Sequence, residues 1–168
     1  KLTLLRYNPN GSLDTSFGVS GRAIANFAAS SFAESLALQP DGKLVAAGRG
    51  ANKIAVARFT ASGLLDPAFD VDGMLSLGVP SGSLDDIARS VALQADGKIV
   101  LGIHQVLYRF VVLRINADGS KDISFDGDGE ANAYLEYSHA DKVLVQPDGK
   151  ILVGGNERNR FTLARFNP

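Results

Sequence analysis

The sequence predicts an all-β fold made of β-propeller blades, and three observations support this prediction. A seven-residue block occurs three times in the 168 residues, beginning at Gln39, Gln94 and Gln146. Two further blocks recur between its copies in constant order. The segments between turns are short, and several are apolar on both faces, with no helical periodicity or helix caps. Several short strands in each repeat of 50-odd residues are typical of a propeller.

The three blocks can be followed through their first copies. The first block is Gln39-Pro40-Asp41-Gly42-Lys43-Leu44-Val45, the second is Arg6-Tyr7-Asn8, and the third is Gly11-Ser12-Leu13-Asp14-Thr15-Ser16-Phe17. We expect residues 1–168 to be a single repeat domain or part of a larger propeller. The predicted repeats cover approximately residues 4–57, 58–113 and 114–166.

Each repeat is predicted to contain four short antiparallel strands, A to D. In the first repeat these cover about residues 22–27, 34–39, 43–48 and 54–59. Pro40-Asp41-Gly42 joins B to C as a hairpin turn, because Pro presets φ, Asp caps the turn and Gly supplies a positive φ. Strands C and D are apolar on both faces, which suits a sheet that is covered on both sides.

A single blade cannot bury both of its faces, so neighbouring blades have to cover them. A D-like strand at residues 2–7 precedes the repeats, which gives three four-stranded repeats plus one extra strand. A β-sandwich is the alternative fold, but a sandwich needs no sequence repeat. Three blades are fewer than the roughly four that close a ring. We therefore expect neighbouring blades of a longer chain as partners, or a second copy in a homodimer.

The pattern Arg-Phe/Tyr-Asn-x-x-Gly-Ser-Leu-Asp-x-Ser-Phe, followed by Leu-Gln-Pro-Asp-Gly-Lys-Ile/Leu-Val, resembles the delta-60 repeat β-propeller family. The resemblance covers the whole chain in three copies. It implies a β-propeller in a large secreted or surface-exposed bacterial protein, without assigned chemistry and so without catalytic residues to carry over. The chain departs from the pattern at Thr60, Pro67, Ala95 and Lys121, which leaves the fold prediction intact.

The composition argues against several classes of function. The chain has seventeen basic and eighteen acidic residues, so its net charge does not favour nucleic acid as a partner. The chain has no Cys and no apolar run of transmembrane length. His104 and His139 fall in different repeats at predicted loop positions, neither beside a second His, and each is expected to be a surface imidazole. No nucleophile elbow or dinucleotide loop occurs. We expect no enzyme activity and no cofactor.

Acidic residues before glycines form the one pattern that suggests a metal. Spaced carboxylates ending in Gly resemble the start of a calcium loop. The first repeat has Gly18-Val19-Ser20-Gly21 instead, and no Glu follows at EF-hand spacing. A tight turn is therefore favoured, no metal is expected, and calcium binding is the weaker alternative. The candidate calcium ligands are Asp70, Asp72, Asp126 and Asp128.

Arg and Asp recur eight residues apart in three copies. A catalytic pair would converge on one site, whereas repeated pairs are spread around a ring. We expect partly buried ion pairs that clamp the D–A connection onto its strand. The predicted pairs are Arg6 with Asp14, Arg58 with Asp66, and Arg114 with Asp122.

Two sets of loops differ in how well they repeat. The D–A and B–C connections are nearly constant, whereas the A–B and C–D connections diverge, and divergent loops are the place for recognition. We expect a non-catalytic scaffold or interaction module, with adhesion as one role, outside the cell or on a bacterial surface, with a protein or glycan ligand. The alternative is a carbohydrate-binding, calcium-dependent or enzymatic propeller that uses the divergent face. Tyr and Arg dominate binding hot spots, so the candidate binding residues are Tyr108, Arg109, Tyr137, Arg158 and Arg160.

Overall fold

The computed structural model confirms the all-β prediction. It describes every residue of the chain except 29, 79–85, 105–109, 134 and 136. Within the described part there are thirteen strands, the number predicted, and no helix that is long and apolar enough to cross a membrane. The strands are β1 (Leu2–Leu5), β2 (Arg22–Ala25), β3 (Ser31–Leu38), β4 (Leu44–Gly50), β5 (Lys53–Phe59), β6 (Met74–Leu77), β7 (Ile87–Leu93), β8 (Ile99–His104), β9 (Phe110–Ile115), β10 (Glu130–Asn132), β11 (Ser138–Val145), β12 (Ile151–Glu157) and β13 (Arg160–Phe166).

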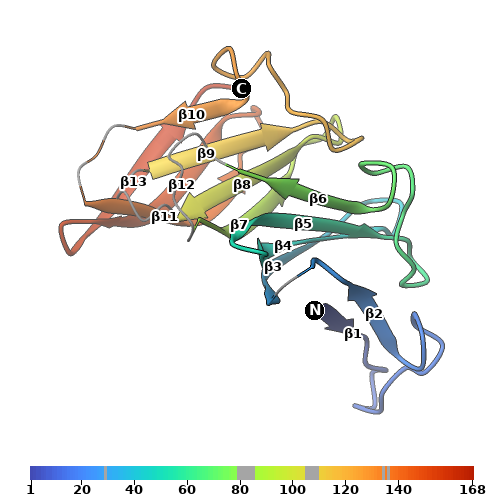
Figure 1. Cartoon of the computed structure of the whole chain (residues 1–168). Helices are drawn as coiled ribbons and strands as arrows, with labels where there is room; N and C mark the ends of the chain where they lie inside the picture. Colours follow the sequence, from blue (N-terminus) through green and yellow to red (C-terminus); the bar gives the residue numbers. More distant parts are fainter. Residues whose placement is uncertain (29, 79–85, 105–109, 134, 136) are drawn as a thin grey trace.

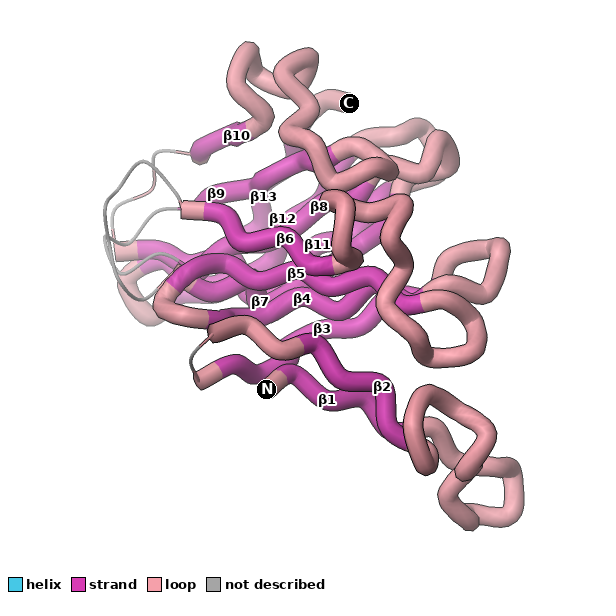
Figure 2. Tube along the Cα trace, turned by 45° about the vertical axis from the view of Figure 1, so that its right-hand side comes forward, coloured by secondary structure: helices cyan, strands magenta, loops and turns pink. Residues whose placement is uncertain are grey.

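The strands form four antiparallel sheets that follow one another along the chain, as blades do (Figure 1). β1 and β2 make a two-stranded sheet. β3 to β6 form the first complete blade, β7 to β10 the second, and β11 to β13 a three-stranded third sheet. Figure 2 shows the β1–β2 pair beside the first complete blade. These sheets have the size and order expected of propeller blades rather than of a sandwich.

The predicted grouping of strands into blades is wrong in one respect. The strand that begins each predicted repeat pairs with the last strand of the repeat before it. Arg22–Ala25 pairs with β1, and β6 pairs with β5 through Ile54↔Leu77 and Ala57↔Met74. Each complete blade therefore contains strands B, C and D of one repeat and strand A of the next. The physical reason is that the D–A connection folds back on strand D, whereas the A–B connection crosses to another blade.

Strands β3, β7 and β11 form the inner edges of the three blades and contact one another in sequence. Each has a β-bulge at the same repeat position, where Glu34, Arg89 and Asp141 are the inserted residues. Hydroxyl groups beside the bulges join the inner strands. Ser35 Oγ accepts a hydrogen bond from the Val91 amide at 3.2 Å, and Ser90 Oγ accepts one from the Val143 amide at 3.1 Å.

The hydrophobic core lies between the blades, so that every interior blade is covered on both sides. On β5, Ile54 and Val56 face the second blade, whereas Ala55 and Ala57 face the β1–β2 sheet. This confirms the predicted two-sided strands. Because β5 is apolar on both faces, it can only be stable between two neighbouring sheets.

The B–C turns form as the sequence predicts. In the first copy, Asp41 Oδ1 accepts a hydrogen bond from the Lys43 amide at 3.1 Å, and Gly42 has a φ of +85°. A side chain on Gly42 would be strained at this φ. Lys43 also lies 3.2 Å from Asp66, which places the B–C turn beside the D–A loop, on the expected common face.

Candidate functional site

The repeated Arg/Asp residues form an ion-pair clamp in all three copies. The Nε–Oδ2 distances lie between 2.7 and 2.8 Å. The guanidinium of Arg58 also lies 5.0 Å from the centroid of the Phe69 ring and donates a hydrogen bond to the carbonyl oxygen of Ala117, in the D–A loop of the next blade. The clamp therefore does more than the predicted attachment of a loop to its own strand, since it also links neighbouring blades.

The charged groups of the interior clamps are withdrawn from water. Arg58 and Asp66 are each only 5% exposed. Burial by itself raises the pKa of Asp66, but hydrogen bonds from the Ala68 amide and from Lys43, together with the charge of Arg58, outweigh burial and leave that pKa lowered. The carboxylate therefore stays ionised at neutral pH, and the pair acts as a structural link.

The acidic turns that suggested calcium serve to shape the backbone. Asp70 has a φ of +45° and occupies the position that Gly18 holds, with a φ of +60°, in the first repeat. Its amide donates a 2.8 Å hydrogen bond to the carbonyl oxygen of Asp118, which lies in the D–A loop of the second complete blade. Asp72 Oδ1 accepts the Met74 amide at 2.9 Å. Asp tolerates this left-handed conformation better than most residues, which explains why it alternates with Gly.

The equivalent acids of the second complete blade follow the same arrangement. Asp126 has a φ of +50°, and Asp128 Oδ1 accepts the amide of Glu130 at 2.9 Å. Among the residues that the structure describes, no three His, Cys, Asp or Glu side chains come together as a metal site.

An open cavity of about 690 Å³ lies among the B–C turns at the inner ends of the blades. Residues at equivalent repeat positions line it in all three sheets, so it is a property of the repeat. In each copy a Gln side-chain oxygen is buried and has no hydrogen-bond partner within the described structure. These lining glutamines are Gln39, Gln94 and Gln146.

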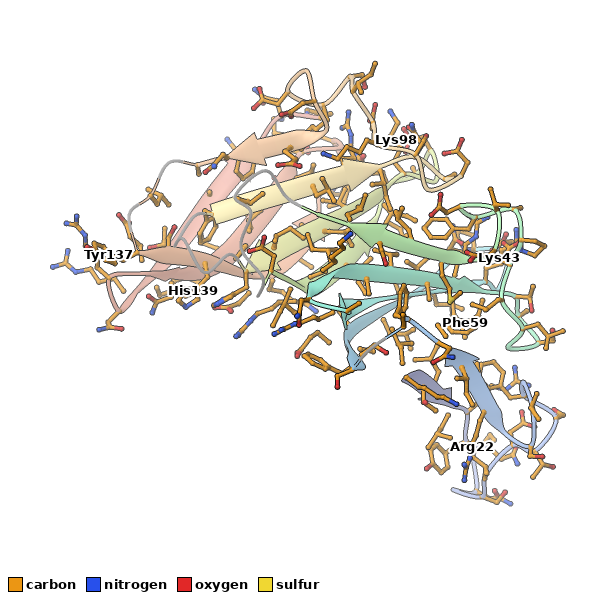
Figure 3. The ribbon with its side chains drawn as sticks, in the orientation of Figure 1. Arg22, Lys43, Phe59, Lys98, Tyr137 and His139 are labelled. Carbon is orange, nitrogen blue, oxygen red and sulfur yellow. The ribbon has the colours of Figure 1, made fainter. Side chains whose placement is uncertain are left out.

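The described parts of the divergent loops lie at the opposite end of the molecule from the B–C turns, as Figure 3 shows by the separation of Tyr137 and His139 from Lys43 and Lys98. Of the candidate binding residues, Tyr108 and Arg109 lie outside the described residues. Tyr137 and Arg158 come together, with the guanidinium 5.9 Å from the ring centroid and the Arg158 amide donating to the Tyr137 carbonyl oxygen at 3.2 Å.

The remaining candidate, Arg160, is exposed at the first residue of β13. The structure thus joins two of the five candidate residues into one exposed patch.

A cluster that the sequence analysis missed lies near this loop face. His104 ends β8 and His139 lies in β11, so neither is the loop residue expected. Their ring centroids are 4.7 Å apart with the rings tilted by 50°. Arg89 and Asp141, the charged bulge residues of the inner strands β7 and β11, form an ion pair of 3.2 Å. The expectation of two separate surface imidazoles is therefore wrong.

The cluster is specific to one blade interface. At the preceding interface the positions of His104 and His139 are occupied by Arg49 and Ile87, because the repeats align these residues. The repeat itself therefore does not require histidine there. The sequence does contain a signal for the proximity of the two histidines. His104 is the last residue of a strand C, and His139 lies in the first part of the following strand B.

Acidification is expected to destabilise the protein through His104. Burial, followed by the positive charges of Arg89 and His139, lowers the pKa of His104 below 6.5, and Asp141 opposes this shift. The unfolded chain therefore takes up a proton at a higher pH than the folded chain, and stability falls as the pH drops below 6.5. Thermal melts between pH 7.5 and 5 should show a falling Tm, with a smaller slope in His104→Gln. An unchanged slope in that variant would contradict this role of His104.

Comparison with protein families gives one match. The model described as "Domain of unknown function (DUF5122) beta-propeller" matches more than half of the chain, and its matched segments contain the repeated blocks and the clamps. None of the curated proteins compared with the chain matches it. The matched segments are residues 2–17, 39–69, 94–125 and 146–168.

Proposed function

The chain belongs to the DUF5122 β-propeller family, whose function is unknown, and we propose that it is a non-catalytic scaffold module. In this proposal its blades pack against further blades of the same repeat, and its divergent loop face binds a protein or glycan partner. The setting is a secreted or surface protein of a bacterium with a role in adhesion, and the repeat is of the delta-60 type. The location and partner class follow the resemblance of the repeated blocks to that type.

One observation carries the scaffold proposal, namely the exposure of apolar residues at positions that interior blades bury. Phe161 of β13 occupies the repeat position of Phe110, yet Phe161 is 81% exposed and Phe110 is fully buried. Leu163 is likewise exposed, whereas its equivalent Val112 is buried. A neighbouring blade covers Phe110 and Val112, so a sheet of the same repeat is the natural cover for Phe161 and Leu163.

The opposite end of the blade stack has the complementary feature. Leu36 and Leu38 of β3 are 52% and 68% exposed, whereas Val91, the equivalent of Leu36 in the second blade, is 6% exposed against the first blade. The two ends of the stack therefore expose the two apolar surfaces that pack against each other where interior blades meet. We name Leu144, Phe161 and Leu163 the C-terminal end face, and Leu36 and Leu38 the N-terminal end face.

The clamps support a non-catalytic role. The charged residues that recur in every repeat pair with one another and with neighbouring backbone, so their chemistry serves the joints between blades. A scaffold of this kind leaves recognition to the loops, and Tyr137 with Arg158 is the exposed aromatic and cationic pair there.

The test of this proposal is binding of the intact chain to immobilised glycans and to immobilised extracellular-matrix proteins. We expect binding to at least one panel, and we expect Tyr137→Ala/Arg158→Ala to weaken it at least tenfold with an unchanged Tm. Absence of binding to both panels, or binding that the double variant retains in full, would count against the loop face as the recognition surface.

The second candidate function is a ligand-binding or enzymatic propeller. The observation that favours it is the cluster of Arg89, His104, His139 and Asp141 near the divergent face. Turnover of chromogenic ester, phosphate or glycoside substrates by the intact chain, lost in His104→Gln, would favour this function over the scaffold.

A further inference from the structure

We propose that His104 and His139 form a binding site for a transition-metal ion of the Zn²⁺, Ni²⁺ or Cu²⁺ class, joining the second blade to the third sheet. This site goes beyond the scaffold role and does not depend on it. His104 comes from the end of β8 and His139 from the inner strand β11 of the next sheet (Figure 3 labels His139). An ion held by both rings would therefore bridge two neighbouring sheets.

The geometry of the two rings is suitable for a shared ion. The ring centroids are 4.7 Å apart, and the planes are tilted by 50° rather than stacked in parallel. Metal–nitrogen bonds to imidazole are about 2.0–2.1 Å long. Two rings at this separation can bring one nitrogen each to a single ion.

The hydrogen bonding of the rings leaves nitrogen atoms available. Nδ1 of His104 and Nδ1 of His139 are both buried, and neither has a hydrogen-bond partner within the described part of the chain. A buried polar atom without a partner costs free energy. One metal ion would satisfy both nitrogens at once, because neutral imidazole offers a lone pair to a metal.

The surrounding charges permit a cation. Arg89, whose positive charge acts on His104, forms a 3.2 Å ion pair with Asp141. Imidazole ligands suit Zn²⁺, Ni²⁺ and Cu²⁺, whereas Ca²⁺ and Mg²⁺ prefer oxygen ligands. The site therefore selects against the ions that the acidic turns suggested.

The rest of the chain offers no other imidazole or thiolate ligand that would complicate a test of metal binding. The sequence contains two histidines and no cysteine, so His104 and His139 are its only imidazoles and no thiolate competes with them. Only these two residues can supply imidazole nitrogen ligands in a tag-free chain. The other coordination positions of the ion would be filled by water.

The experiment is calorimetric titration of the tag-free intact chain with ZnCl₂ at pH 7.5, with CaCl₂ as the control metal. We expect one Zn²⁺ per chain, at least tenfold weaker binding in His104→Ala and in His139→Ala, and unchanged affinity in the control variant Asp72→Asn. At a hundredfold excess over Kd, Zn²⁺ should raise the Tm of the unmodified chain by about 5–10 °C. Equal Zn²⁺ affinity in the double variant His104→Ala/His139→Ala, or no binding at 1 mM (about the weakest affinity of interest), would overturn the proposal.

A spectroscopic measurement keeps the proposal falsifiable if a variant fails to fold. The electron paramagnetic resonance spectrum of the Cu²⁺-loaded unmodified chain should show coupling to two imidazole nitrogens. The conservative variant His139→Gln should reduce this to one. A spectrum without imidazole coupling in the unmodified chain would contradict the site, whatever the variants do.

Discussion

Replacing Asp66 by alanine is expected to lower the free energy of unfolding by about 2–3 kcal/mol. The reason is that Arg58, which is 5% exposed, would lose its buried counter-ion. Breaking a buried pair typically costs about 3–5 kcal/mol, but Arg58 would keep its contacts with the Phe69 ring and the Ala117 carbonyl oxygen. Urea denaturation of the unmodified chain and of Asp66→Ala measures the difference.

The chain supplies its own matched control for this prediction. Asp14 occupies the same repeat position, but its partner side chain, that of Arg6, is 42% exposed. Asp14→Ala should therefore lower the free energy of unfolding clearly less than Asp66→Ala does, because exposed ion pairs contribute little. Equal losses in the two variants would show that burial of the clamp between blades contributes nothing to its strength.

Truncating Phe110 is expected to have the largest effect of any single change considered. Phe110 is fully buried among residues of the third sheet, so Phe110→Ala should lower the free energy of unfolding by about 3–5 kcal/mol. Phe161→Ala removes the same side chain at the same repeat position, where it is 81% exposed. Measured at low protein concentration, this second variant should change the stability by no more than about 0.5 kcal/mol.

The comparison is informative because the two residues differ only in what covers them. A large loss of stability in Phe161→Ala under dilute conditions would mean that Phe161 is already buried within one molecule. That result would contradict an uncovered C-terminal end face.

The features that the sequence predicts correctly depend on local or repeated information. The B–C turns follow from Pro40, Asp41 and Gly42, whose conformational preferences act within four residues. The pairing of Arg58 with Asp66 could be predicted because the same spacing occurs in three copies. The order of residues along β5 predicts which of them share a face of the strand, because successive side chains on a strand point to opposite sides.

The features that the sequence analysis missed depend on the contact between blades. The sequence predicts strand A within its own repeat because a repeat can be divided at any point, and only hydrogen bonding shows that Arg22–Ala25 pairs with β1. His104 and His139 are 35 residues apart, and their proximity depends on how β8 and β11 of adjacent sheets align. The bulges at Arg89 and Asp141 help to set that alignment, and a bulge leaves little trace in a pattern of apolar residues.

We propose that the end faces of this blade stack bind further sheets of the same repeat. Native mass spectrometry of the intact chain, together with sedimentation at micromolar concentration, tests it most directly. We predict species heavier than the monomer that are lost in Phe161→Asp but kept in Ile123→Asp, which places the same charge on an apolar loop residue that is 72% exposed. A stable, soluble monomer with a cooperative thermal melt would contradict the claim.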